Sequence, residues 1–118
     1  MMESMKSSLE ILFGSTAAKL LLYLFHHGEA YATGAGKDLE ITQSAVQRQL
    51  EKLETTGLLI SKLAGRTRMY AFNPKAPGTS ELKALVEVYY KGMSIRERER
   101  MFPTRRRPRR QGKPVKGR

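Results

Sequence analysis

The stretch between Lys37 and Pro74 constrains the fold of this chain most strongly. Its hydrophobic spacing indicates a short helix, a tight turn and a second helix over residues 42–56 with one apolar and one polar face. Two short strand-like segments follow, at residues 58–63 and 68–72, and the four residues between them suit a hairpin turn. This order of elements is typical of the winged helix-turn-helix, in which the second helix enters the major groove of DNA.

The second helix carries its own start and stop signals. Thr42 is predicted to be the N-cap, with its side chain accepting a hydrogen bond from a backbone N–H of the first turn. Gly57 is predicted to supply a left-handed residue that ends the helix. Between them Val46, Leu50 and Leu53 recur at helical spacing. These three residues are therefore expected to face the core.

The opposite face of this helix is rich in amides, a hydroxyl and a guanidinium, and Glu51 shares it. Glutamine can bind adenine through two hydrogen bonds, arginine can bind guanine in the same way, and a serine near a helix N-terminus suits phosphate. An ordinary solvated amphipathic helix would show the same pattern, so the helix alone leaves both interpretations open. The candidate DNA-binding positions on this helix are Thr42, Gln43, Ser44, Ala45, Gln47, Arg48 and Lys52.

The expected hairpin is cationic. Arg66 lies at its tip, flanked by Lys62 and Arg68. Such a hairpin can reach phosphates, or the minor groove, whose negative potential attracts arginine. Charges could also serve only to keep the hairpin soluble and to protect its edge from pairing. Beside a candidate recognition helix we favour contact with DNA.

These segments resemble the ArsR-type winged-helix transcriptional regulators, taken as a broad superfamily. The resemblance rests on LFGSTAAKLLLYLFHHGE (12–29), ITQSAVQRQLEKLETTGLL (41–59) and YAFNP (70–74). It implies a mainly α fold with a small β-hairpin, a dimer formed through the terminal helices, binding to operator DNA, and release by a ligand or metal. It also implies recognition through Gln43, Ser44, Ala45, Gln47 and Arg48, with Arg66 at the wing tip.

Two departures limit what the resemblance implies. The chain has no cysteine, which excludes thiolate coordination of a metal. Glu40 occupies the turn before the second helix, where relatives often have glycine, so this turn is expected to differ in detail. Gly34 and Gly36 should each weaken the preceding helix by roughly 1 kcal/mol relative to alanine, and a short or frayed helix is expected there.

The C-terminal residues carry most of the net charge. Residues 103–118 contain eight cations and no acid, whereas the whole chain of 118 residues has a net charge of +11. We therefore expect a winged-helix domain over residues 1–102 and a disordered basic tail over 103–118 that binds polyanions with little sequence reading. RNA or an acidic membrane surface would also attract such a tail. Its candidate DNA contacts are Arg105, Arg106, Arg107, Arg109 and Arg110.

Helices are also expected on both sides of the central motif. A helix starting at Ser15 or Thr16 has a broad apolar face that should pack beneath the second helix of the motif. A final helix, capped by Thr79 or Ser80, is expected to run on through the charged residues to Arg100. A helix of that length would exceed what one small body covers, which favours a homodimer formed with the N-terminal helix. Folding back onto the same domain is the alternative.

The sequence favours a binding protein over an enzyme. No serine, histidine and carboxylate show an active-site pattern, and no cofactor is expected. The chain has neither an apolar segment long enough to cross a bilayer nor a secretion signal, so we expect a cytoplasmic protein without membrane insertion. The leading hypothesis is a sequence-specific regulator of transcription, a repressor that occupies its operator on double-stranded DNA, with a possible unknown effector. The alternatives are an accessory nucleic-acid binder dominated by the tail and a winged-helix module that binds protein.

Overall fold

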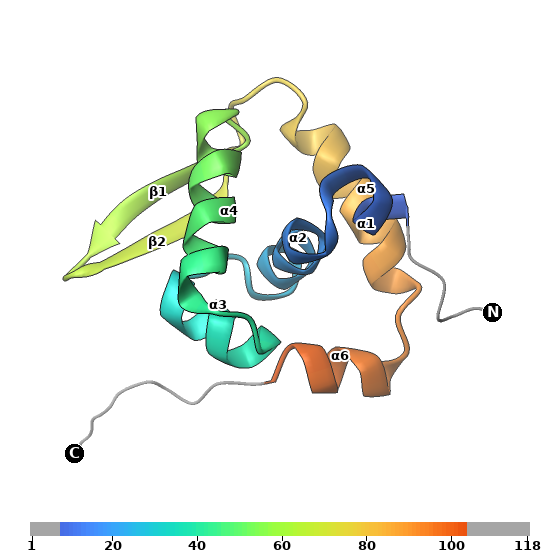
Figure 1. Ribbon diagram of the computed structural model, residues 1–118. Helices are drawn as coiled ribbons and strands as arrows, with labels where there is room; N and C mark the ends of the chain where they lie inside the picture. Colours follow the sequence, from blue (N-terminus) through green and yellow to red (C-terminus); the bar gives the residue numbers. More distant parts are fainter. Residues whose placement is uncertain (1–7, 104–118) are drawn as a thin grey trace, which may run out of the picture.

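The computed structural model describes residues 8–103, which form a mainly α-helical fold with one two-stranded antiparallel hairpin (Figure 1). This confirms the expected fold class. The elements in chain order are α1 (Ser8–Phe13), α2 (Ser15–His27), α3 (Ala32–Leu39), α4 (Gln43–Thr55), β1 (Leu59–Ala64), β2 (Thr67–Phe72), α5 (Thr79–Lys91) and α6 (Ile95–Met101).

The core is built around α2. Figure 1 shows this helix in the middle, with α4 and the hairpin on one side and α5 on the other. Leu20, Leu21 and Leu24 are completely buried on α2, in the same cluster as Val46 and Leu50 of α4. The packing of the early helix beneath the second helix of the motif is therefore as expected from the apolar spacing. Within residues 8–103 no helix is both long and apolar enough to cross a membrane.

The hairpin is attached to the helical body through β2. Its register pairs Ala64 with Thr67, which leaves a two-residue turn at Gly65 and Arg66. On the other edge of β2, Tyr70 exchanges two backbone hydrogen bonds with Ala30, of 2.8 and 2.9 Å. The strands begin at residues 59 and 67, each displaced by one residue from the boundary expected from sequence. The bridge to Ala30 therefore fixes the direction in which the hairpin projects from the helical body.

The turn between α3 and α4 keeps a left-handed residue although that residue is not glycine. Glu40 has φ 60° and ψ 45°, and the backbone N–H of Ile41 donates to the Gly36 carbonyl over 2.9 Å. A Cβ on Gly36 would lie 2.7 Å from the Ile41 carbonyl oxygen, so glycine permits this close approach. A Cβ on Gly34 would likewise lie 2.7 Å from the ring of Tyr31. The two glycines thus serve packing, and α3 is short as expected but regular.

Replacing Glu40 with glycine is expected to raise the free energy of unfolding by ~1 kcal/mol, because a left-handed conformation strains residues with a side chain. The control is Glu99→Gly, the same chemical change within α6. It should instead lower stability by ~1 kcal/mol, since glycine is a poor helix former. Urea unfolding of both variants measures the difference, and a loss of stability in Glu40→Gly would contradict the role assigned to this turn.

The expectation of one long C-terminal helix is wrong. Helix α5 stops at Lys91, and α6 begins anew after Ser94. A capping box starts α6: Ser94 Oγ accepts from the Glu97 N–H at 3.0 Å, and Glu97 Oε1 accepts from the Ser94 N–H at 2.9 Å. The expected cap of α5 also differs, because Gly78 is the N-cap residue and Thr79 lies inside the helix, 1 % exposed.

Helix α6 returns to the helical body and ends on a buried aromatic residue. Phe102 is 2 % exposed, and its ring stacks on His26 with 5.1 Å between centroids. His26 Nδ1 lies 2.6 Å from the Tyr90 hydroxyl, which ties α2 to α5 at the same place. Burial, together with the nearby Arg98 guanidinium, lowers the pKa of His26. Because α6 folds back, the length of the helix no longer argues for a dimer.

Candidate nucleic-acid interface

Helix α4 is positioned by the N-cap and the apolar residues that were predicted from sequence. Thr42 Oγ1 accepts a hydrogen bond from the Ala45 N–H at 3.3 Å, which confirms the predicted N-cap. Val46 and Leu50 are completely buried and Leu53 is 7 % exposed. Gly57, with φ 89°, follows the last turn. The polar face of α4 must therefore point away from the core.

The candidate positions on α4 differ in how far they are available. Ala45 and Gln47 are half-buried, and the Thr42 hydroxyl is occupied as the helix cap. Among the described residues, the exposed candidates on this face are Gln43, Ser44, Arg48 and Lys52. Gln43 and Ser44 lie in the first turn of α4, where the helix dipole favours anions.

A groove joins the first turns of α4 to the hairpin. It has a volume of about 460 Å³, and Gln43 and Gln47 line it from α4 while Arg66 and Arg68 line it from the turn and β2. Four positions selected from two separate segments of sequence therefore meet in one hollow. The start of α3 completes the groove through Tyr31, Ala32 and Thr33, which the sequence analysis did not select. The only sequence signal for them was their place at the start of the first helix of the motif.

The three cations of the hairpin have different surroundings. Arg66 is exposed at the tip. Arg68 Nη1 donates to Ser61 Oγ at 3.0 Å, and Ser61 in turn donates to Glu54 Oε2 at 2.6 Å, which connects the hairpin to the last turns of α4. Lys62 does not line the groove and instead borders a smaller hollow of about 150 Å³. Of the three hairpin cations, Arg66 and Arg68 therefore meet at the groove and Lys62 does not.

Gln47 is held by two hydrogen bonds inside the protein. Its Nε2 donates to Glu51 Oε2 at 2.8 Å and to the Tyr70 hydroxyl at 3.0 Å. Tyr70 is 1 % exposed and lies on β2, so the contact links α4 directly to the hairpin. This network could not be predicted from sequence, because it joins two residues 23 positions apart.

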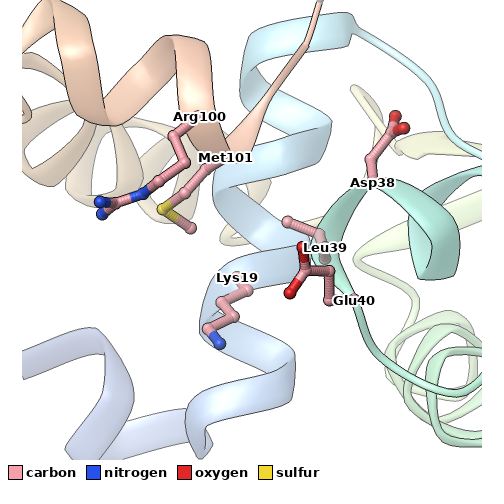
Figure 2. A pocket seen from close by; sticks show the side chains of 6 residues that line it. All are labelled: Lys19, Asp38, Leu39, Glu40, Arg100 and Met101. Carbon is pink, nitrogen blue, oxygen red and sulfur yellow. The ribbon is translucent and has the colours of Figure 1, made fainter.

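A second hollow, of about 270 Å³, lies between α2, α6 and the turn that holds Glu40. Figure 2 shows the Arg100 guanidinium and the Asp38 carboxylate pointing away from one another, and Asp38 accepts a hydrogen bond from the Tyr23 hydroxyl at 2.6 Å. Its charged groups therefore do not converge on one point. In the part of the chain that the structure describes, no group of three or more metal-binding side chains is found. The candidate tail residues Arg105, Arg106, Arg107, Arg109 and Arg110 lie outside the described residues.

Comparison with known proteins gives similarity in overall structure alone. No family model and no curated protein matches the chain. One similar solved structure is a double mutant of ZitR from Lactococcus lactis in its apo form, with 21% identity, 72% of this chain and 73% of that chain covered, and a TM-score of 0.46. Another is the adhesin competence repressor AdcR from Streptococcus pyogenes, with 18% identity, 78% of each chain covered, and a TM-score of 0.48.

Proposed function

We propose that this chain is a winged-helix regulator of transcription that binds double-stranded DNA. In this proposal α4 enters the major groove and the hairpin of β1 and β2 contacts the backbone or the minor groove. The observation that carries it is the groove in which Gln43 and Gln47 of α4 meet Arg66 and Arg68 of the hairpin. Amide groups for base edges and cations for phosphates lie there on adjoining elements, as DNA recognition requires.

The finer form of the proposal is a cytoplasmic repressor of the ArsR type that occupies its operator as a homodimer. Steric occupancy is the simplest mechanism for a body with one small core. Exposed apolar residues favour a second copy as the partner of the terminal helices: Ile11 is 73% exposed and Leu12 66% on α1, and Val88 is 63% exposed on α5. A two-fold dimer would present two α4 helices to half-sites about one DNA turn apart. An effector, if one exists, would act at that interface.

Replacing Arg48 with alanine is expected to relax base preference at one position of the DNA site by ~1–3 kcal/mol, because arginine reads guanine through two hydrogen bonds. The fold should survive, since Arg48 is exposed. Binding to duplexes that differ at one base pair measures the effect. Arg96→Ala, which removes the same exposed group from α6, is the matched control and should leave base preference unchanged. Full preference retained in Arg48→Ala would exclude Arg48 from the reading face.

The proposal as a whole is tested by selecting binders from a randomised duplex pool with the full chain at near-physiological salt. An enriched palindromic motif is expected, because a two-fold dimer reads two copies of one half-site. A folded protein that enriches no DNA motif would overturn the proposal that it recognises specific base pairs. The eight cations of residues 103–118 would then favour an accessory binder of nucleic acid, in which affinity is electrostatic and independent of sequence.

A further inference from the structure

The two hydrogen bonds of Gln47 decide which of its atoms remains available to DNA. A glutamine amide has two N–H donors and one carbonyl acceptor. Both acceptors around Gln47 contact the same atom: Nε2 lies 2.8 Å from Glu51 Oε2 and 3.0 Å from the Tyr70 hydroxyl oxygen. Both donors of this side chain are therefore used within the protein. Only the carbonyl oxygen Oε1 remains available to contact DNA.

The chemistry of Glu51 fixes this orientation of the amide. A carboxylate can only accept hydrogen bonds, so the nitrogen side of the Gln47 amide must face it. Turning the amide over would bring two oxygens together and lose the bond. The Glu51 side chain reaches Gln47 from one turn further along α4, at the i,i+4 spacing at which helical side chains meet.

Tyr70 makes the arrangement rigid, because it cannot follow the amide if Gln47 moves. Its side chain is 1 % exposed, and its backbone exchanges hydrogen bonds of 2.8 and 2.9 Å with Ala30. The hydroxyl therefore occupies a fixed point at the base of the hairpin. A partner held by buried packing confers more orientation than an exposed one, which would lose side-chain entropy on binding.

We propose that Gln47 reads DNA only as a hydrogen-bond acceptor, through Oε1, and that Tyr70 and Glu51 are the positioning residues that impose this role. The inference rests on the proposed function, and it replaces the expectation that Gln47 binds adenine through two hydrogen bonds. That pairing requires the amide nitrogen to donate to adenine N7. With Nε2 occupied, Gln47 accepts from an amino group in the major groove, which both adenine (N6) and cytosine (N4) provide.

The two arginines of the groove leave the acceptor role to side chains of α4. Arg66 and Arg68 supply only donors, which suit phosphates and the acceptor edge of guanine. Glu51 Oε1, on an exposed side chain, adds a second acceptor next to Gln47. This part of α4 therefore disfavours guanine and thymine at the contacted base, since both present acceptors there.

The test compares base preference in full-length variants selected from a randomised duplex pool. The wild type is expected to accept adenine and cytosine at one position and to reject guanine and thymine by at least about fivefold. Tyr70→Phe combined with Glu51→Ala frees the amide, and the preference should then narrow to adenine. Tyr89→Phe, the same loss of a hydroxyl on α5, is the matched control and should keep the wild-type profile.

A second variant keeps the inference testable if the first does not fold. Glu51→Ala alone leaves the buried Tyr70 hydroxyl in place and frees one N–H of the Gln47 amide. The preference for adenine over cytosine should then rise by at least about fivefold, because the freed N–H can donate to adenine N7. A profile left unchanged by Glu51→Ala would show that this carboxylate does not set the role of Gln47 and would overturn the inference.

The outcomes separate this inference from the proposed function. The wild type could instead enrich a motif with adenine alone at the position read by Gln47. If Tyr70→Phe with Glu51→Ala then leaves this preference unchanged, the proposed function stands and the inference is overturned. Gln47→Ala identifies that position, because only there should preference disappear. A folded wild type that enriches no motif overturns both.

Discussion

Leu50→Ala is expected to lower the free energy of unfolding by ~2–5 kcal/mol, because it removes a completely buried side chain and leaves a cavity between α4 and α2. Thermal or urea unfolding of the full chain measures the loss. Affinity for DNA should change little under conditions in which the variant remains folded, since Leu50 points away from the polar face of α4.

Leu63→Ala provides the matched control for this prediction. It makes the same chemical change at a hairpin position that is 61% exposed, and little transfer free energy is lost there. Its effect on stability should stay below ~0.5 kcal/mol, as for other surface changes. Equal effects of the two variants would contradict the packing of α4 described here.

Deleting residues 104–118 is expected to weaken binding to any duplex by roughly a hundredfold or more at near-physiological salt, since it removes all eight cations of the tail. The slope of log affinity against log salt should become shallower by up to about 7, the value for eight neutralised phosphates. The ratio between specific and non-specific affinity should persist, because the proposed base contacts come from α4. Titrations of one specific and one unrelated duplex over a range of salt concentrations measure all three quantities.

A variant in which glutamines replace the eight tail cations separates the effect of tail charge on DNA affinity from the effect of tail length. It should behave as the deletion does if the contribution is electrostatic. A tail deletion that leaves the salt slope unchanged would show that residues 104–118 do not contact phosphates. Loss of the specificity ratio on deletion would instead assign base reading to the tail.

The helix-turn-helix and its hairpin could be predicted from sequence because each is specified by neighbouring residues. Thr42 at the start, Gly57 at the end and apolar residues at helical spacing define α4 without reference to the rest of the chain. Arg66 was placed correctly at the hairpin tip because the strand pattern stops on both sides of it. Local signals of this kind act within a few residues, which is the range that sequence patterns resolve well.

The return of α6 could not be predicted in the same way. Met93 and Ile95 continue the apolar pattern of α5 across the break, so periodicity alone favours one helix. The capping box of Ser94 and Glu97 was a local signal for a new helix start. The apolar pattern, which favours one continuous helix, outweighed this signal in the prediction. The contact that holds the end of α6 joins Phe102 to His26, far apart along the chain, and no local pattern indicates it.

The network at Gln47 was missed for a related reason. Outward spacing on α4 correctly placed its side chain on the polar face, but spacing does not show which polar atoms are already paired. That information depends on the bridge between Tyr70 and Ala30, which sets where the hairpin crosses α4. Which polar atoms are available at an interface thus depends on tertiary contacts. The exposed face of a helix, in contrast, can be predicted from local spacing.

The buried ring of Phe102 limits how far from the helical body residues 104–118 could contact DNA under the proposed function. Because Phe102 packs on His26 of α2, the covalent reach of these residues is counted from a fixed point. Covalent geometry allows at most about 3.3–3.6 Å per residue, so Arg118, which follows Phe102 by 16 positions, lies within about 58 Å of that ring. At 3.4 Å per base pair this distance corresponds to about 17 base pairs. If the chain binds DNA as proposed, nuclease protection by residues 104–118 should not extend beyond that distance from the end of α6. Removing some of these residues should shorten the protected stretch by up to about one base pair per residue.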